Sequence, residues 1–185
     1  MIWQVSKACC DQTTCSLLDA MRKHLYFICP TDYLEATINQ VFGQENYFVT
    51  SLGNNLDFDT AHIEEINALI QSKDIGGVSI ILADNNPIVL DALGDRRFAT
   101  ISSLDNLYHQ ISRQQQDLSK LWHSTDLSTT ILSAYLADKV DKLNAQLRNR
   151  AGLKVAIDAK IFNPQTDVFS EIFATLIPCE YFMLN

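Results

Sequence analysis

The chain has 185 residues, of which 47% are apolar and 19% charged, a composition that supports one packed domain and excludes a disordered chain. Its formal net charge of −8 repels phosphate backbones, so we expect no nucleic-acid partner. The longest apolar runs, such as Val78 to Ala83, fall far short of the roughly 20 residues that a membrane-spanning helix needs, so we expect no membrane association.

The first predicted elements are a helix, a strand and a second helix. Thr13 and Thr14 can cap a helix, which makes residues 1–24 an N-terminal helical segment of a single domain over 1–185. His24 to Cys29 is a short apolar strand that Pro30 ends. Asp32 and Glu35, three positions apart, form a capping-box-like start for the second helix. The start of the chain lacks the pattern of a signal peptide, so we expect a cytoplasmic protein.

The middle of the chain continues the alternation of strands and helices. Tyr47 to Leu52 is rich in β-branched and aromatic residues and predicts a strand, and Gly53-Asn54-Asn55 ends it as a turn. Asp59 or Thr60 caps a third helix. The continuous apolar run Val78 to Ala83 is typical of a strand that is covered on both faces.

The last third predicts mainly helix. Apolar spacing indicates helices near Ile88 to Leu93 and around Leu104 to Ile111, and a long helix from Leu127 to Asn149. A strand from Leu153 toward Phe162 follows, then a turn at 163–166. The fold class is therefore α/β, with a mainly parallel sheet flanked by helices. Ligands of such sheets bind at the carboxyl ends of strands, which here are the loops at 29–33, 53–56 and 84–87.

Those three loops resemble the β-carbonic anhydrases. In that family the strands end in Cys-x-Asp-x-Arg, Arg-Asn-Ala-Gly-Asn and Cys-Gly-His-x-x-Cys-Gly. The corresponding stretches here are Ile28-Cys29-Pro30-Thr31-Asp32-Tyr33, Phe48-Val49-Thr50-Ser51-Leu52-Gly53-Asn54-Asn55 and Ile81-Leu82-Ala83-Asp84-Asn85-Asn86-Pro87. The segment from Val155 to Phe169 is similar to the last strand of the family and the turn that follows it. The resemblance spans about Leu25 to Phe169.

The same comparison implies that the catalytic zinc is lost. Cys29 matches the first cysteine ligand, whereas Asp84 stands at the histidine position and Pro87 at the second cysteine position. The Asp–Arg pair of the family falls on Thr31 and Tyr33, with Asp32 one residue out of register. One thiolate and one carboxylate fall short of the three protein ligands that a catalytic zinc site needs. We therefore expect no cofactor, no metal and no CO2 hydration by the family mechanism.

The remaining cysteines offer no replacement site in their spacing. Cys9, Cys10, Cys15 and Cys179 complete an odd count of five, and free thiols are the expectation. The former pocket would comprise Cys29, Asp32, Asn55, Asp84 and Asn85. Each has a plainer interpretation as well: Cys29 as a small buried residue, Asp32 as a helix cap, and the Asp84-Asn85-Asn86 run as turn or cap residues.

Three functions stay open at this point. The first is a non-catalytic β-carbonic anhydrase homologue, a pseudoenzyme that binds a partner or an unidentified small molecule; the resemblance also implies a homodimer. The second is an enzyme whose Cys29, Asp32, Asn55 and Asp84 carry zinc-independent chemistry in the former pocket. The third is a zinc carbonate dehydratase with displaced ligands, supplied for example by the segment from Cys9 to Cys15.

Overall fold

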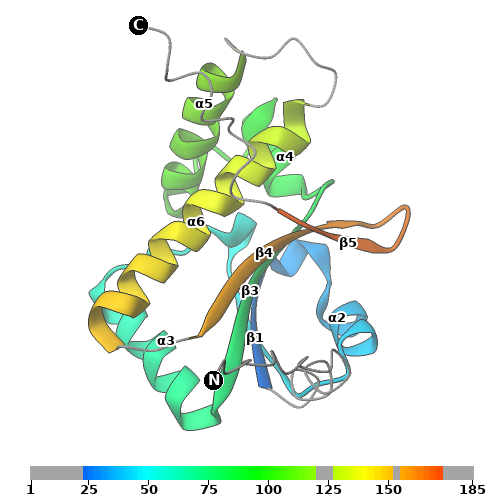
Figure 1. Cartoon of the computed structure of the whole chain (residues 1–185). Coiled ribbons are helices and arrows are strands. Elements are labelled where there is room, and N and C mark those ends of the chain that lie inside the picture. The colour runs from blue at the N-terminus through cyan, green and yellow to red at the C-terminus, as the bar shows by residue number, and fades with distance from the viewer. Residues whose placement is uncertain (1–22, 120–126, 152–154, 173–185) are drawn as a thin grey trace, which may run out of the picture.

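The computed structural model describes residues 23–119, 127–151 and 155–172 (Figure 1). One sequence prediction, the N-terminal helical segment 1–24, lies almost wholly outside the described residues. Residues 23 and 24 are described, and they belong to the first strand instead of a helix.

One five-stranded sheet organises the molecule, with strand order β2-β1-β3-β4-β5. The first four strands run parallel, and β5 pairs with β4 in the antiparallel direction. The predicted mainly parallel sheet is therefore confirmed, while β5 was not anticipated. The strands are β1 (Lys23–Ile28), β2 (Asn46–Thr50), β3 (Ile75–Ala83), β4 (Ala156–Asn163) and β5 (Val168–Glu171).

Five α-helices and three short 3-10 helices connect the strands in the described part of the chain. The α-helices are α2 (Glu35–Val41), α3 (Thr60–Lys73), α4 (Pro87–Leu93), α5 (Asp105–Ser119) and α6 (Leu127–Ala151). The 3-10 helices are η1 (Pro30–Asp32), η2 (Leu52–Asn54) and η3 (Ser102–Leu104). None of these helices is both long and apolar enough to cross a membrane.

The two faces of the sheet carry cores of different size, because side chains alternate along each strand. Leu25 and Phe27 of β1 point to the larger core, which α3, α4, α5 and α6 cover. Tyr26 and Ile28 point to a smaller core, which α2 covers through Leu34 and Ile38. Figure 1 shows α2 on one side of the sheet and the long α6 on the other, as expected for a sheet flanked by helices.

The helix starts follow local sequence in two cases and depart from it in a third. Asp59 caps α3 by accepting from His62 N–H, and Asn86 caps α4, whose first residue is Pro87. The prediction that Asp32 starts α2 in a capping box was wrong. The residue before α2 is Leu34, no side chain caps it, and the Asp32 carboxylate is engaged elsewhere.

Candidate functional site

The loops that follow β1, β2 and β3 lie at one edge of the sheet. These strands are parallel neighbours, so their carboxyl ends meet there. Cross-loop hydrogen bonds hold the loops together: Ser51 N–H donates to Ile28 O at 3.1 Å, and Gly53 N–H donates to Cys29 Sγ at 3.1 Å. The fold therefore brings the loops of the expected pocket side by side.

Cys29 ends β1 as a fully buried free thiol with 0% exposure. Its sulfur accepts the Gly53 N–H and also lies 3.0 Å from Thr31 Oγ1. The interpretation of Cys29 as a small buried residue is confirmed. The sulfur that would be a metal ligand or nucleophile is held by two groups of its own chain and has no access to solvent.

Gly53 and Asn54 shape the loop after β2. Gly53 has φ +60°, and a Cβ on it would overlap Leu107 Cδ1, so glycine is required by conformation and by space. Asn54, at φ 52°, is 1% exposed and donates through Nδ2 to Ile81 O at 2.8 Å and Phe27 O at 3.3 Å. Its amide thus joins β1 and β3 near their carboxyl ends.

Asp32 joins the loop after β1 to the end of β3. Its carboxylate accepts Ala83 N–H at 2.9 Å and Asn86 Nδ2 at 2.7 Å. Burial raises the pKa of Asp32, and these two hydrogen bonds offset part of that rise. Asn86 uses its other amide atom, Oδ1, to accept Ile88 N–H and Val89 N–H in the first turn of α4. Asp32 is therefore a structural tie between two loops.

The other residues of the expected pocket are less closely connected. Asp84 is half-buried, and its N–H donates to Phe162 O. Asn85 is exposed, and it forms a turn with Asp84, as the turn interpretation predicted. Asn55 turns toward the start of α5 and donates to Ser103 O at 2.7 Å. Among the described residues, Thr31 and Asn86 link Cys29 to Asp32, and the side chains of Asn55 and Asn85 make no hydrogen bond to this group.

Three oxygens in the loop after β2 are buried without a hydrogen-bond partner among the described residues: Ser51 Oγ, Asn54 Oδ1 and Asn55 Oδ1. Unpaired buried acceptors are uncommon in folded proteins. Because all three oxygens are buried, a ligand can reach them only if this loop moves.

Sequence reasoning missed two anchors of this site. Tyr135 of α6 donates its hydroxyl to Gly53 O at 3.0 Å and is also 3.3 Å from Asn54 O. Four residues later, Lys139 donates to Leu56 O at 3.1 Å. The signal was available, because Tyr135, Lys139 and Leu143 follow each other at helical spacing along the buried side of α6. The helix α6 thus fixes the 53–56 loop through hydrogen bonds to its backbone carbonyl groups.

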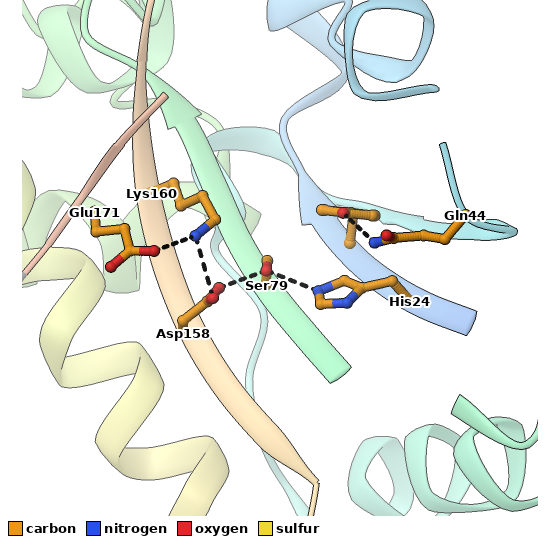
Figure 2. Close-up of polar contacts among 7 residues, drawn as sticks. His24, Gln44, Ser79, Asp158, Lys160 and Glu171 are labelled. Atoms are coloured by element: carbon orange, nitrogen blue, oxygen red, sulfur yellow. Dashed lines mark hydrogen bonds and ion pairs between the residues drawn. The ribbon is translucent and has the colours of Figure 1, made fainter. Parts of the chain in front are cut away.

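A second polar cluster crosses the sheet face on the side of α2 (Figure 2). His24 Nε2 lies 2.8 Å from Ser79 Oγ, and Ser79 donates to Asp158. Lys160 continues the row, at 3.2 Å from Asp158 and 3.1 Å from Glu171. Burial lowers the pKa of His24, while the Asp158 charge acts in the opposite direction. Ser79 is 1% exposed, so this row has the geometry of a cross-strand network and not of an accessible nucleophile.

The comparisons with known proteins identify the fold. No family model and no curated protein matches the chain. Among solved structures, the β-carbonic anhydrase CafA of Aspergillus fumigatus is similar with a TM-score of 0.62 and 14% identity, over 89% of this chain and 84% of that one. A mutant of CafD from the same fungus gives 0.65 and 13%, over 82% and 90%. Tetrameric β-carbonic anhydrases of Sordaria macrospora give 0.60 and 11%, over 86% and 85%. At these identities the similarity shows the fold alone: the chain has the α/β fold of the β-carbonic anhydrases.

The zinc ion that this fold family implies does not fit the side chains at the carboxyl edge. Of the cysteines, only Cys29 belongs to the described residues, and it lies at this edge; Asp84 supplies a half-buried carboxylate, and Pro87 has no ligating side-chain atom. The residue before it, Asn86, is engaged in capping α4 and in binding Asp32. Within the described ranges, no group of three or more His, Cys, Asp or Glu residues is arranged to hold a metal ion.

Proposed function

We propose that this chain is a non-catalytic homologue of the β-carbonic anhydrases, one that keeps the scaffold and acts as a binding or regulatory protein without zinc. The observation that carries the proposal is the construction of the loop after β3. Asn86 and Pro87 form the start of α4, with the Asn86 side chain bound to two backbone N–H groups and to Asp32. A loop built in this way supplies a helix cap where the family resemblance requires metal ligands.

The partner of such a protein follows from the same fold similarity. We propose that the chain forms a homodimer, which the tetrameric assembly of the similar Sordaria macrospora enzymes supports. The cytoplasmic location that we expect is part of this proposal.

Zinc content is the first test. Protein purified without added metal or chelator is measured by elemental mass spectrometry, and CO2 hydration is followed by stopped flow. We expect zinc well below one ion per chain and no hydration above the uncatalysed rate. Zinc near one per chain, together with hydration activity, would overturn the proposal and favour a dehydratase with displaced ligands.

Two variants make the zinc test sharper. Cys29→Ser removes the one thiol that the described residues place at the carboxyl edge, so any zinc that persists in this variant is bound without Cys29. Asp84→His combined with Pro87→Cys places the missing donors at the positions that the resemblance assigns. This double variant is expected to bind more zinc than the parent, and a gain that disappears with Cys29→Ser places the restored site at these loops.

A zinc-independent enzyme is the second candidate, and one observation favours it. Ser51, Asn54 and Asn55 each keep a buried oxygen without a partner among the described residues, and a substrate can bond to these oxygens where the loop opens to admit it. It is the weaker candidate because the sulfur of Cys29, its proposed nucleophile, is fully buried and already bound by Gly53 N–H and Thr31 Oγ1. Alkylation of Cys29 in the folded protein at the rate of an exposed thiol would favour this candidate over the first.

A further inference from the structure

A cavity of about 470 Å³ lies beside α6, away from Cys29 and Asp32. The segment after η2 forms one wall through Leu56, Asp57, Phe58 and Asp59, and α5 contributes Asn106 and Gln110. Lys139 and Lys142 reach it from α6. Neither the fold similarity nor the expected pocket includes this cavity.

Lys139 is the unusual group in this cavity. Its side chain is 2% exposed, and Nζ lies 5.3 Å from the centre of the Tyr135 ring and 5.9 Å from that of Phe58. The hydrogen bond to Leu56 O is the one that its amine makes to the described residues. An ammonium group has three N–H donors, so two of them have no protein partner in this part of the chain.

The surroundings of Lys139 increase the fraction of its amine that is neutral near pH 7.5. Burial lowers the pKa of Lys139 to about 8, and the nearby Lys142 cation lowers it further, while Asp138 and Asp57 act in the opposite direction. Lys142 is itself paired with Asp138 at 2.6 Å. Desolvation and a neighbouring cation are the two conditions that turn a lysine into an amine nucleophile near neutral pH.

The cavity also offers a hydrogen-bond acceptor without a partner. Gln110 Oε1 is buried and has no partner among the described residues, while Nε2 of the same amide donates to Asn106 Oδ1 at 3.2 Å. Asp57 and Asp59 make the rim acidic, and Lys142 is the one further cation that lines it. These groups suit a neutral ligand that donates hydrogen bonds better than they suit an anion.

We propose that Lys139 is a carbonyl-reactive amine that forms an imine with a small, neutral hydroxyaldehyde or hydroxyketone bound in this cavity. The amine lone pair attacks the carbonyl carbon, a C–N bond forms, and a proton from nitrogen passes to the carbonyl oxygen to give a carbinolamine. The C–O bond then breaks, the oxygen leaves as water with a second proton from nitrogen, and C=N remains. The reaction consumes no oxidant or reductant, and it is independent of zinc.

The test is reductive trapping with site mapping. The full chain is incubated with glyceraldehyde and sodium cyanoborohydride near pH 7.5, and modified lysines are located by peptide mass spectrometry over time. We expect Lys139 to be modified at least about tenfold faster than Lys142, because a larger fraction of its amine is neutral. Lys142 lies on the same helix and is the internal control. Modification of Lys142 as fast as Lys139, or none at Lys139, would overturn the proposal.

Two variants and a second aldehyde complete the design. Lys139→Arg keeps a cation but removes the nucleophilic amine, so the fast modification should disappear, while Lys142→Arg should leave it in place. Circular dichroism verifies that both variants fold. The comparison of Lys139 with Lys142 in the parent chain tests the proposal even if a variant fails to fold. Glyoxylate, an anionic aldehyde, should modify Lys139 more slowly than glyceraldehyde does. Equal rates would refute the preference for a neutral ligand.

Discussion

At the carboxyl edge of the sheet, Asp32 and Cys29 each have two partners from their own chain, whereas Lys139 in the cavity beside α6 has one acceptor among the described residues for its three N–H donors. The edge corresponds to the pocket that the family resemblance assigns, and its ionisable groups tie loops together. The cavity has no counterpart in the resemblance, and its lysine retains unused hydrogen-bonding capacity. The comparison teaches that the position of an expected site and the presence of available chemical groups are separate questions.

Gly53→Ala gives the largest expected loss of stability and tests how tightly the edge is built. A left-handed conformation costs a residue with a Cβ about 1–2 kcal/mol. The overlap with Leu107 adds about 1–3 kcal/mol. Chemical denaturation of the variant and the parent measures the difference in unfolding free energy.

Gly43→Ala is the matched control for that experiment. A Cβ at Gly43 meets nothing within 4 Å, and the residue is exposed. Its unfolding free energy should stay close to that of the parent. If the two alanine variants are equally stable, the edge is more adaptable than we infer.

Asp32→Ala should cost somewhat less and shows whether Asp32 is a structural tie. It leaves Ala83 N–H without this acceptor and leaves Asn86 Nδ2 with only the longer hydrogen bond to Thr31 Oγ1 at 3.4 Å, which costs about 1–3 kcal/mol for buried groups. Because the pKa of Asp32 is raised on folding, its contribution is fully present below the unfolded pKa and declines as pH rises through the folded pKa. The loss should therefore be greater in acid than at neutral pH, and denaturation at several pH values measures it. A loss that grows as pH rises would contradict this assignment.

Lys139→Met should have the smallest effect and the opposite sign. The pKa of Lys139 falls from 10.5 to about 8 on folding, so its contribution is present above pH 10.5 and is lost as pH falls toward 8. At pH 7 the variant should be more stable than the parent by about 1–2 kcal/mol, since the cost of the buried cation exceeds that of its hydrogen bond. Denaturation at pH 7 and pH 10 compares the two chains. A variant that loses stability at pH 7 would show that Lys139 resembles Asp32 in being a tie.

Local patterns predicted the elements that carry their own signal. The continuous apolar run of β3 and the helical stripe of α6 were assigned to the correct element type, and the turn at 163–166 is held by Asn163 Oδ1. The strand β5 was not predicted, because its four residues include only one half-buried side chain and so show no hydrophobic alternation. That strand exists through its pairing with β4.

The sequence predicted where the candidate site lies, at the carboxyl edge of the sheet, but not which hydrogen bonds its residues make. The expected parallel sheet predicted that these three loops follow the carboxyl ends of its strands, where ligands of such sheets bind. The bonds of Asp32 join residues 51 and 54 positions apart, which a capping pattern over four residues does not contain. Lys139 was missed for a local reason. It lies at the helical spacing of the buried stripe of α6, but a lysine is normally assigned to the exposed side of a helix.

The polar row from His24 to Glu171 bears on how the strands find their alignment (Figure 2). Alternating side chains penalise a slip of one residue, because apolar groups would then turn to the wrong face. A slip of two residues keeps every side chain on its face, so the apolar pattern alone tolerates it. In the native register Ser79 lies opposite Asp158, and Lys160 lies opposite Glu171. Sliding β4 by two residues places Lys160 or Ala156 against Ser79 instead. The polar row therefore distinguishes alignments that hydrophobic burial leaves nearly equal in energy.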